Sequence, residues 1–302
     1  MQITIKVKKY LIISIAIWTA FFMIGCRKLV DTEYHNFIPS PVINSIIKAG
    51  DKLYVHVSVN SKYDAQEING MDNAVVKLFA DDIFIEQLSS TGNGLFISEI
   101  SAEPMVEYVL QVSIPGFSDA ICKTIIPSAT SISGIEHIAV AGKDVEGVTY
   151  PAIKFNFHTI PHEDQYFEAR IRLIRNGNEC LADIINITDP ILLNEGLPLS
   201  VFSNNLIHDT TYTMRINYTT GSSSSTGGSS YTDLFPFILE IRSVSKDYYL
   251  FARQKYLYDS GRFPEFGLST NTAFPLYSNV ENGYGIFAGY SVAVSDTIFP
   301  HY

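Results

Sequence analysis

Residues 211–219, TYTMRINYT, show the clearest period-two alternation in the chain. Apolar or aromatic side chains alternate with polar ones, as in a strand with one buried face and one solvated face. The inward-facing set is Tyr212, Met214, Ile216 and Tyr218. The alternation predicts a β-strand here and indicates a mainly β fold.

Strands of the same period lie along residues 37–128. Residues 52–60 and 107–114 alternate apolar with polar side chains, and Asp81-Asp82 stands between two apolar runs as a two-residue hairpin turn. About six or seven short strands bounded by turns are typical of an immunoglobulin-like β-sandwich. We therefore predict that fold for residues 37–128.

A second β-rich, sandwich-like domain is expected over residues 129–302. Residues 167–175 alternate and end in Asn176-Gly177, a common hairpin turn. Residues 221–230, GSSSSTGGSS, are too polar to bury, so we predict a flexible loop between two adjacent strands.

One α-helix is predicted, near residues 245–259. Ser245 can cap its N-terminus, Asp247 is favourable in the first turn, and Gly261 can adopt a left-handed conformation beyond the end. We expect the helix to cover one side of the second sheet.

Residues 1–25 have the composition of an export signal. Three lysines precede an apolar run over residues 10–24, which is shorter than a membrane-spanning helix of about 20 residues. We predict a cleaved signal peptide, with an uncleaved signal anchor as the alternative.

The signal ends in Gly25-Cys26, a pattern that resembles bacterial lipoprotein signal peptides. The resemblance implies that the Cys26 thiol receives diacylglycerol and becomes the mature N-terminus. Residues 26–36 are polar and without period, so they are expected to be an acylated tether. Acyl chains contribute about 0.8 kcal/mol per buried CH₂ group, which makes such attachment effectively permanent.

The charge and cysteine counts exclude two classes of protein. With 21 Lys and Arg against 31 Asp and Glu, the net charge is −10, which repels phosphate backbones, so we expect no nucleic-acid partner. Three cysteines are too few for a disulfide-built scaffold. Whether Cys122 and Cys180 pair stays open, with two buried thiols as the alternative.

The sequence contains no recognisable catalytic, metal or cofactor motif. His158 and His162 are four residues apart, but Pro161 breaks any helix that would bring both to one metal ion. There is no G-x-S-x-G nucleophile elbow. The glycines of residues 283–289 do not fit the dinucleotide fingerprint, and we expect them to allow close backbone approach. We predict no enzyme activity, no metal and no cofactor, with a hydrolase that uses two acids as the alternative.

Residues 279–290 permit two interpretations. In the first, which we favour, a closing strand packs onto the second sheet through Ile286, Phe287 and Tyr290. In the second, the turn displays candidate binding residues to a ligand or a receptor: Asn279, Glu281 and Tyr284.

Several blocks of the chain are similar to Bacteroidota lipoproteins of the family catalogued as domain of unknown function 4249. The most specific block is residues 275–290, PLYSNVENGYGIFAGY; others are residues 244–256, 75–96 and 108–117. The resemblance implies an outer-membrane lipoprotein often encoded beside a TonB-dependent receptor, and it implies no catalytic residues.

Together these observations predict a non-enzymatic accessory lipoprotein, anchored by its lipid on either face of the outer membrane. It would capture a small-molecule, glycan or peptide ligand for a TonB-dependent receptor, or associate with that receptor. The alternatives are the hydrolase and a structural or adhesive surface protein.

Overall fold

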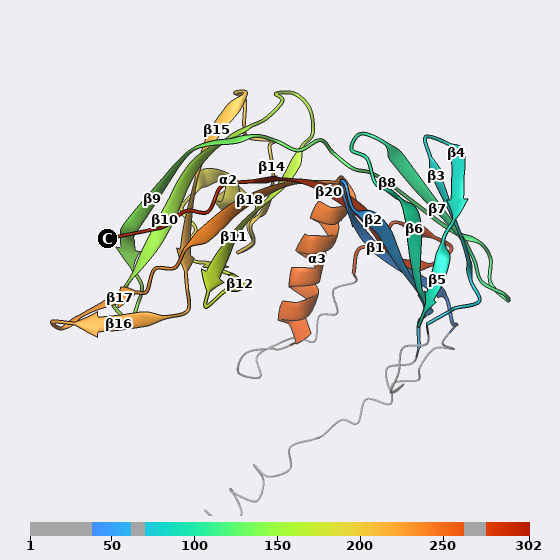
Figure 1. Ribbon diagram of the computed structural model, residues 1–302, viewed down its shortest axis with the longest axis horizontal. Helices are drawn as coiled ribbons and strands as arrows, with labels where there is room; N and C mark the ends of the chain where they lie inside the picture. The colour runs from blue at the N-terminus through green and yellow to red at the C-terminus, as the bar shows by residue number, and fades with distance from the viewer. Residues whose placement is uncertain (1–37, 62–69, 263–275) are drawn as a thin grey trace, which may run out of the picture. The chain divides into compact units, whose positions relative to one another are not determined.

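The computed structural model describes residues 38–61, 70–262 and 276–302, within which the chain is mainly β, as predicted (Figure 1). Its strands form three sheets of nine, six and five strands, in a sandwich-like arrangement. The predicted signal peptide and tether, residues 1–36, lie outside the described residues.

The first hydrophobic core lies between the five-stranded sheet and one part of the nine-stranded sheet. Its strands are β1 (Pro41–Lys48), β2 (Lys52–Val59), β3 (Val75–Ala80), β4 (Ile83–Gln87), β5 (Ser89–Gly92), β6 (Leu95–Ser101), β7 (Glu107–Ser113), β8 (Ala120–Ile125), β19 (Val280–Glu281) and β20 (Tyr284–Val294). The five-stranded sheet has the order β19-β8-β7-β3-β4. The predicted alternation over residues 107–114, along β7 and just beyond its end, is confirmed, because four side chains of one face are buried: Tyr108, Leu110, Val112 and Ile114.

The second hydrophobic core lies between the six-stranded sheet and the remainder of the nine-stranded sheet. Its strands are β9 (Ile132–Lys143), β10 (Val148–His158), β11 (Tyr166–Arg175), β12 (Asn178–Leu181), β13 (Asp183–Ile184), β14 (Val201–Ser203), β15 (Thr211–Thr219), β16 (Ser223–Thr226), β17 (Ser229–Thr232) and β18 (Phe237–Val244). Strand β15 matches the predicted strand, with Met214, Ile216 and Tyr218 buried. Asn217 was expected on the solvent face but is also buried, and its Nδ2 donates to the Asn186 carbonyl at 2.7 Å.

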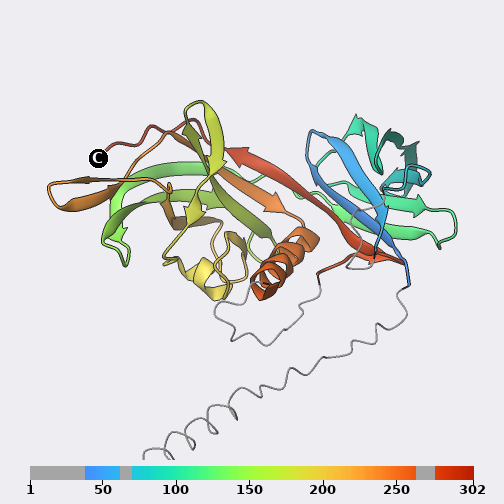
Figure 2. The same cartoon turned by 90° about the horizontal axis from the view of Figure 1, so that it is seen from below.

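Strand β20 belongs to the same sheet as strands from both cores. It pairs in parallel with β1 from Val42↔Tyr284 to Lys48↔Tyr290, and antiparallel with β18 (Figure 2). The predicted closing strand is present and pairs with β18, but it also pairs with β1, and Phe287 packs in the first core rather than onto the second sheet. The predicted division at residue 128 stays a prediction, since β20 contributes to both sets of strands.

Both predicted two-residue hairpin turns are present, between β3 and β4 and between β11 and β12. Asp81 and Asp82 have φ values of 46° and 64°, and Asn176 and Gly177 have values of 50° and 79°. Positive φ at both central residues is the requirement of a type I′ turn, whose twist matches that of the flanking strands.

The predicted loop over residues 221–230 is instead a hairpin of β16 and β17. Strand β17 pairs in parallel with β10 at Val148↔Ser230 and Thr149↔Tyr231. The Ser222 and Ser224 hydroxyls donate to the Asp233 carboxylate, at 2.5 Å each. The prediction from composition was wrong because residues 221–230 have no apolar pattern of their own. Pairing of β17 with β10, a strand far away in the sequence, satisfies backbone hydrogen bonds of the segment.

Helix α3 (Lys246–Arg262) is the predicted helix, and Gly261 lies inside it rather than beyond its end. It lies beside β20, β14 and β11. A second, five-residue helix, α2 (Pro190–Asn194), was not predicted, although Asp189 and Pro190 carry its start signal.

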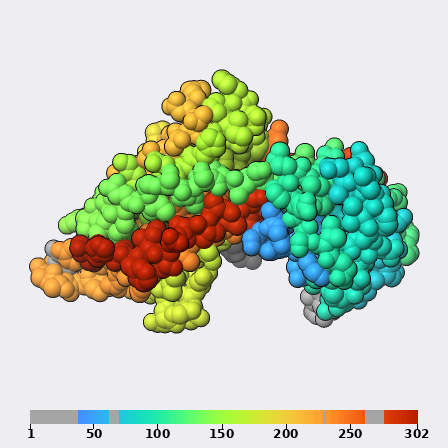
Figure 3. Space-filling model, turned by 45° about the horizontal axis from the view of Figure 1, so that its top comes forward, coloured from blue at the N-terminus to red at the C-terminus, as the bar shows by residue number. Residues whose placement is uncertain are grey.

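On one face of the molecule, β9 and the C-terminal segment lie side by side (Figure 3). Ile132, Ile135 and Ile298 pack against the second core.

Candidate functional site

A cleft of about 540 Å³ opens where β8, the start of β11 and the junction between β18 and α3 come together. One wall includes Met105, Thr124, Ile125 and Pro127. The rest of the lining includes Ile160, Glu163, Asp164, Tyr166, Val244 and Lys246. Its volume falls in the range of pockets that bind small molecules, about 300–1,000 Å³.

Three large apolar side chains that line the cleft are exposed to solvent. Met105 is 68% exposed, Ile125 49% and Ile160 43%. Ile125 is exposed because β8 alternates strictly, and Ala120, Cys122 and Thr124 take the buried face. Grouped apolar exposure of this kind marks an interaction site more often than scattered single residues do.

Thr124 borders the cleft, but its hydroxyl lies on the buried face of β8, with Ala120 and Cys122. Thr124 is 3% exposed, and its Oγ1 has no hydrogen-bond partner among the described residues. A buried hydroxyl without a partner costs about 1–3 kcal/mol.

The junction between β18 and α3 is fixed by the Ser245 side chain. Ser245 Oγ accepts from the Tyr248 amide at 3.3 Å, which caps the helix as predicted, and from the Gly289 amide at 3.2 Å. Asp247 Oδ1 accepts from the Tyr277 hydroxyl at 2.7 Å. Burial raises the pKa of Tyr277, and the hydrogen bond to Asp247 raises it further. The start of α3 is therefore tied to β20 through Ser245 and to Tyr277 through Asp247.

The charged side chains of the cleft are unevenly paired. Glu107 and Lys123 form an ion pair at 3.5 Å. Glu163, Asp164 and Lys246 form no ion pair within the part of the chain that the structure describes.

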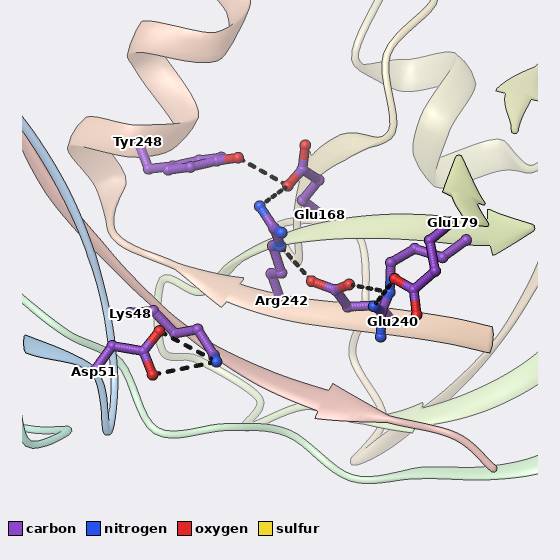
Figure 4. Close-up of polar contacts among 8 residues, drawn as sticks. Lys48, Asp51, Glu168, Glu179, Glu240, Arg242 and Tyr248 are labelled. Atoms are coloured by element: carbon purple, nitrogen blue, oxygen red, sulfur yellow. Dashed lines mark hydrogen bonds and ion pairs between the residues drawn. The ribbon is translucent and has the colours of Figure 1, made fainter. Parts of the chain in front are cut away.

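A ladder of charged side chains ties α3, β11 and β18 together next to the cleft (Figure 4). Glu168 Oε2 accepts from the Tyr248 hydroxyl at 2.8 Å and from Arg242 Nη1 at 3.4 Å. Arg242 Nε donates to Glu240 Oε1 at 2.6 Å, and Glu240 Oε2 lies 3.1 Å from Arg172 Nε. Burial lowers the pKa of Arg242, but the hydrogen bond to Glu240 and the charge of Glu168 outweigh it, so the net pKa is raised.

A second buried carboxylate, Glu195, anchors the same helix. Its Oε1 accepts from the Ser203 amide at 2.7 Å, and its Oε2 accepts from the Tyr249 hydroxyl at 2.6 Å and from Arg253 Nη1 at 2.5 Å. Glu195 and the cleft have no signal in the sequence, because their parts come from segments far apart in the chain. The ladder and this anchor together hold the cleft wall in place without a ligand.

The candidate binding residues of the C-terminal turn are not brought to this cleft. The Asn279 amide is used within the fold, because its Nδ2 donates to the carbonyls of Phe287 and Lys123 at 2.8 and 3.1 Å. Glu281 is exposed, and Tyr284 is 56% exposed beside a shallow depression. A binding role for Glu281 and Tyr284 stays a prediction.

The two cysteines of the described residues do not form a disulfide bond. Cys122 is buried and Cys180 is exposed, and both are free, so the pairing left open is excluded and only one thiol is buried. Cys26, the predicted site of lipidation, lies outside the described residues.

The described residues contain neither a metal-ligating cluster nor a helix suited to span a membrane. No group of three or more His, Cys, Asp and Glu side chains is placed to hold a metal ion. No helix there is long and apolar enough to cross a membrane.

Fold and cleft together define a mainly β protein with two cores joined by one sheet and a preformed cleft beside that sheet. Residues 30–296 match the family described as Domain of unknown function (DUF4249). The chain belongs to this family.

No curated protein matches the chain. A solved structure described as a membrane anchored protein from Corynebacterium diphtheriae is similar over 68% of this chain, with 9% sequence identity and a TM-score of 0.22. This chain spans about half of that one, 54%. A likeness this slight supports no inference about fold or function.

Proposed function

We propose that this chain is a non-enzymatic accessory lipoprotein of the outer membrane, which captures a ligand in the cleft for a TonB-dependent receptor beside it. The observation that carries the proposed ligand capture is the cleft itself, which is lined by the exposed apolar side chains of Met105, Ile125 and Ile160. A rigid, mostly apolar cavity with few polar groups is the usual form of a binding site.

The N-terminal sequence supports a lipid anchor at Cys26. Cys26 follows Gly25 after a short apolar run, in the pattern of lipoprotein signals. The first described strand begins at Pro41, 15 residues after Cys26. Fully extended, such a connection reaches at most about 50 Å, so the folded part would stay close to the bilayer and to proteins embedded in it.

The proposed association with a TonB-dependent receptor rests on the family resemblance. It is tested by isolating the chain from native membranes. A tag placed after Tyr302 would be used to purify the chain from outer membranes after mild crosslinking. We expect a TonB-dependent receptor to co-purify with the lipidated chain and to be lost with Cys26→Ser. If no receptor or other envelope protein co-purifies, the proposed association with a receptor is wrong.

The non-enzymatic part is tested separately. The chain would be incubated with panels of glycans and peptides. Turnover that disappears on substitution of a single carboxylate would contradict the proposal and establish the hydrolase alternative.

A further inference from the structure

We propose that the edge strand β4 is a docking site for an extended segment of another protein, one that carries apolar side chains between basic ones. The segment would add to the five-stranded sheet as a further strand. No residue of β4 lines the cleft, so this docking site is separate from the proposed ligand site and goes beyond the proposed function.

Strand β4 lies at the edge of the five-stranded sheet, next to β3 (Figure 1). Ala80 and Ile83 flank the two-residue turn and pair across it, so their N–H and C=O groups face each other. The N–H and C=O of the next residue, Phe84, therefore point away from β3, where no further strand pairs with β4 among the described residues. Unpaired backbone groups at a sheet edge are a template for a strand of another chain.

Three consecutive apolar side chains of β4 are exposed to solvent. Ile83 is 67% exposed, Phe84 53% and Ile85 38%. Ile85 has no partner in the register with β3, because it is a bulged residue between two paired positions, so the regular alternation of inward and outward side chains is interrupted there. The Phe84 ring packs edge-on against Phe79, with the ring centroids 5.6 Å apart. An apolar strand laid along β4 would remove these side chains from water, which is favourable.

The charges around β4 favour a basic segment. Residues 81–87 carry no basic side chain and three acids: Asp81, Asp82 and Glu86. One lysine of β3, Lys77, is paired with this segment and does not balance the three acids. Basic residues beside the apolar part of an added strand would lie opposite the acids, and opposite charges across two strands stabilise their pairing.

The same charges disfavour a second copy of this chain as the occupant. If two β4 strands paired antiparallel about Phe84, Asp82 of each copy would lie opposite Glu86 of the other. Like charges directly opposite each other destabilise an antiparallel pair. The edge is therefore protected against pairing with itself and open to a basic partner.

Three synthetic peptides separate the contributions of charge and backbone. The first is Lys-Val-Thr-Val-Thr-Val-Lys with blocked ends, the second has Glu in place of both Lys, and the third is the first with N-methyl groups on its three central residues. Binding to the full chain in detergent would be measured by isothermal titration calorimetry. We expect the basic peptide to bind about tenfold more tightly than the acidic one. The N-methylated peptide should not bind, because its central residues have no N–H to donate.

Matched variants place the binding on β4. Phe84→Pro removes the outward N–H and should abolish binding of the basic peptide, and an edge strand tolerates proline at such a position. Phe84→Leu keeps the N–H and an apolar side chain, so it should bind the peptide nearly as tightly as the parent chain. Melting temperatures near that of the parent chain would show that each variant is folded. If Phe84→Pro does not fold, the N-methylated peptide still decides, because it is tested on the parent chain.

A second pair of variants tests the charge. Asp82→Asn keeps a residue that suits the turn and should weaken the basic peptide about two- to fivefold, as expected for an exposed charge. Glu146→Gln, at an exposed position between β9 and β10, is its control and should leave binding unchanged.

Several results would overturn the docking site. They are absence of binding by the basic peptide, equal binding of its N-methylated form, equal or tighter binding of the acidic peptide, and equal effects of Phe84→Pro and Phe84→Leu. Dimers of the parent chain that Phe84→Pro separates, detected by light scattering, would assign the edge to a second copy instead. The membrane isolation tests the association with a receptor without any peptide, so the two proposals fail separately.

Discussion

The side-chain amide of Asn279 and the backbone of Phe287 form a closed pair of hydrogen bonds. The Phe287 amide donates to Asn279 Oδ1 at 2.9 Å, and Asn279 Nδ2 donates to the Phe287 carbonyl at 2.8 Å. A residue that the sequence offered as a binding candidate therefore serves to fix the turn between β19 and β20. Its Nδ2 also reaches the Lys123 carbonyl at 3.1 Å, next to the cleft.

Asn279→Ala is expected to lower the free energy of unfolding by about 1–3 kcal/mol, because it leaves these backbone groups without their partner. Urea unfolding would measure the loss. Glu281→Ala is the control, since its exposed side chain should change stability by less than about 0.5 kcal/mol. Equal effects of the two substitutions would show that the amide pair does not stabilise the turn.

Gly285→Ala is expected to disrupt the pairing of β20 with β1. Gly285 has a φ of +117°, and an added Cβ would lie 1.9 Å from the Ile43 carbonyl oxygen. Gly116 also has a positive φ, +90°, but open space around it, so Gly116→Ala isolates the conformational strain of about 1–2 kcal/mol. Unfolding midpoints compare the two variants, and a Gly285→Ala variant no less stable than Gly116→Ala would refute the close approach of these strands.

We predict that ionisation of the Tyr249 hydroxyl lowers the stability of the folded chain at high pH. Burial, and then the hydrogen bond to Glu195, raise the pKa of Tyr249 to about 12 from an ordinary value of 10.0. Because the folded state holds this proton more tightly than the unfolded chain, the stabilisation is fully present below pH 10 and is lost as the pH rises toward 12. The stability advantage of the parent chain over Tyr249→Phe should therefore shrink across that window, as measured by urea unfolding at several pH values. A stability difference between the parent chain and Tyr249→Phe that stays constant with pH would contradict this prediction. Tyr284→Phe, at an exposed position, controls for general effects of alkaline pH.

The two thiols are expected to react at very different rates. Cys180 is exposed, whereas Cys122 is buried and burial raises its pKa, which disfavours the reactive thiolate. In a Cys26→Ser background, a thiol reagent such as DTNB should label one cysteine rapidly in the native protein and the second only after denaturation. Rapid labelling of both cysteines in the native protein would show that Cys122 is accessible. Rapid labelling of the one cysteine left after a further Cys180→Ser substitution would show the same.

Cys26→Ser is expected to release the protein from membranes without unfolding it, because the described fold begins with β1 at Pro41. Metabolic labelling with a clickable fatty acid, followed by membrane fractionation, would measure both lipid attachment and location. Retention of the label on the Cys26→Ser variant would rule out this cysteine as the modified residue.

Local chemistry was enough to predict much of the secondary structure. Along β7 and β15 the period of two is carried by neighbouring residues, and at Asp81-Asp82 two residues contain the whole turn. The helix cap at Ser245 is equally local, since donor and acceptor lie three residues apart. Such features depend on chain geometry within a few residues, so the sequence by itself determined them.

Features that join distant segments were decided only by the tertiary structure. Residues near position 43 and position 285 become neighbours in one sheet, and Ser230 becomes strand because Val148 pairs with it. The Glu195 anchor likewise exists only once Glu195, Ser203 and Tyr249 have met in the fold. Burial, pairing and electrostatic neighbourhood are properties of the packed chain rather than of any window of sequence, and the candidate site is built from those properties.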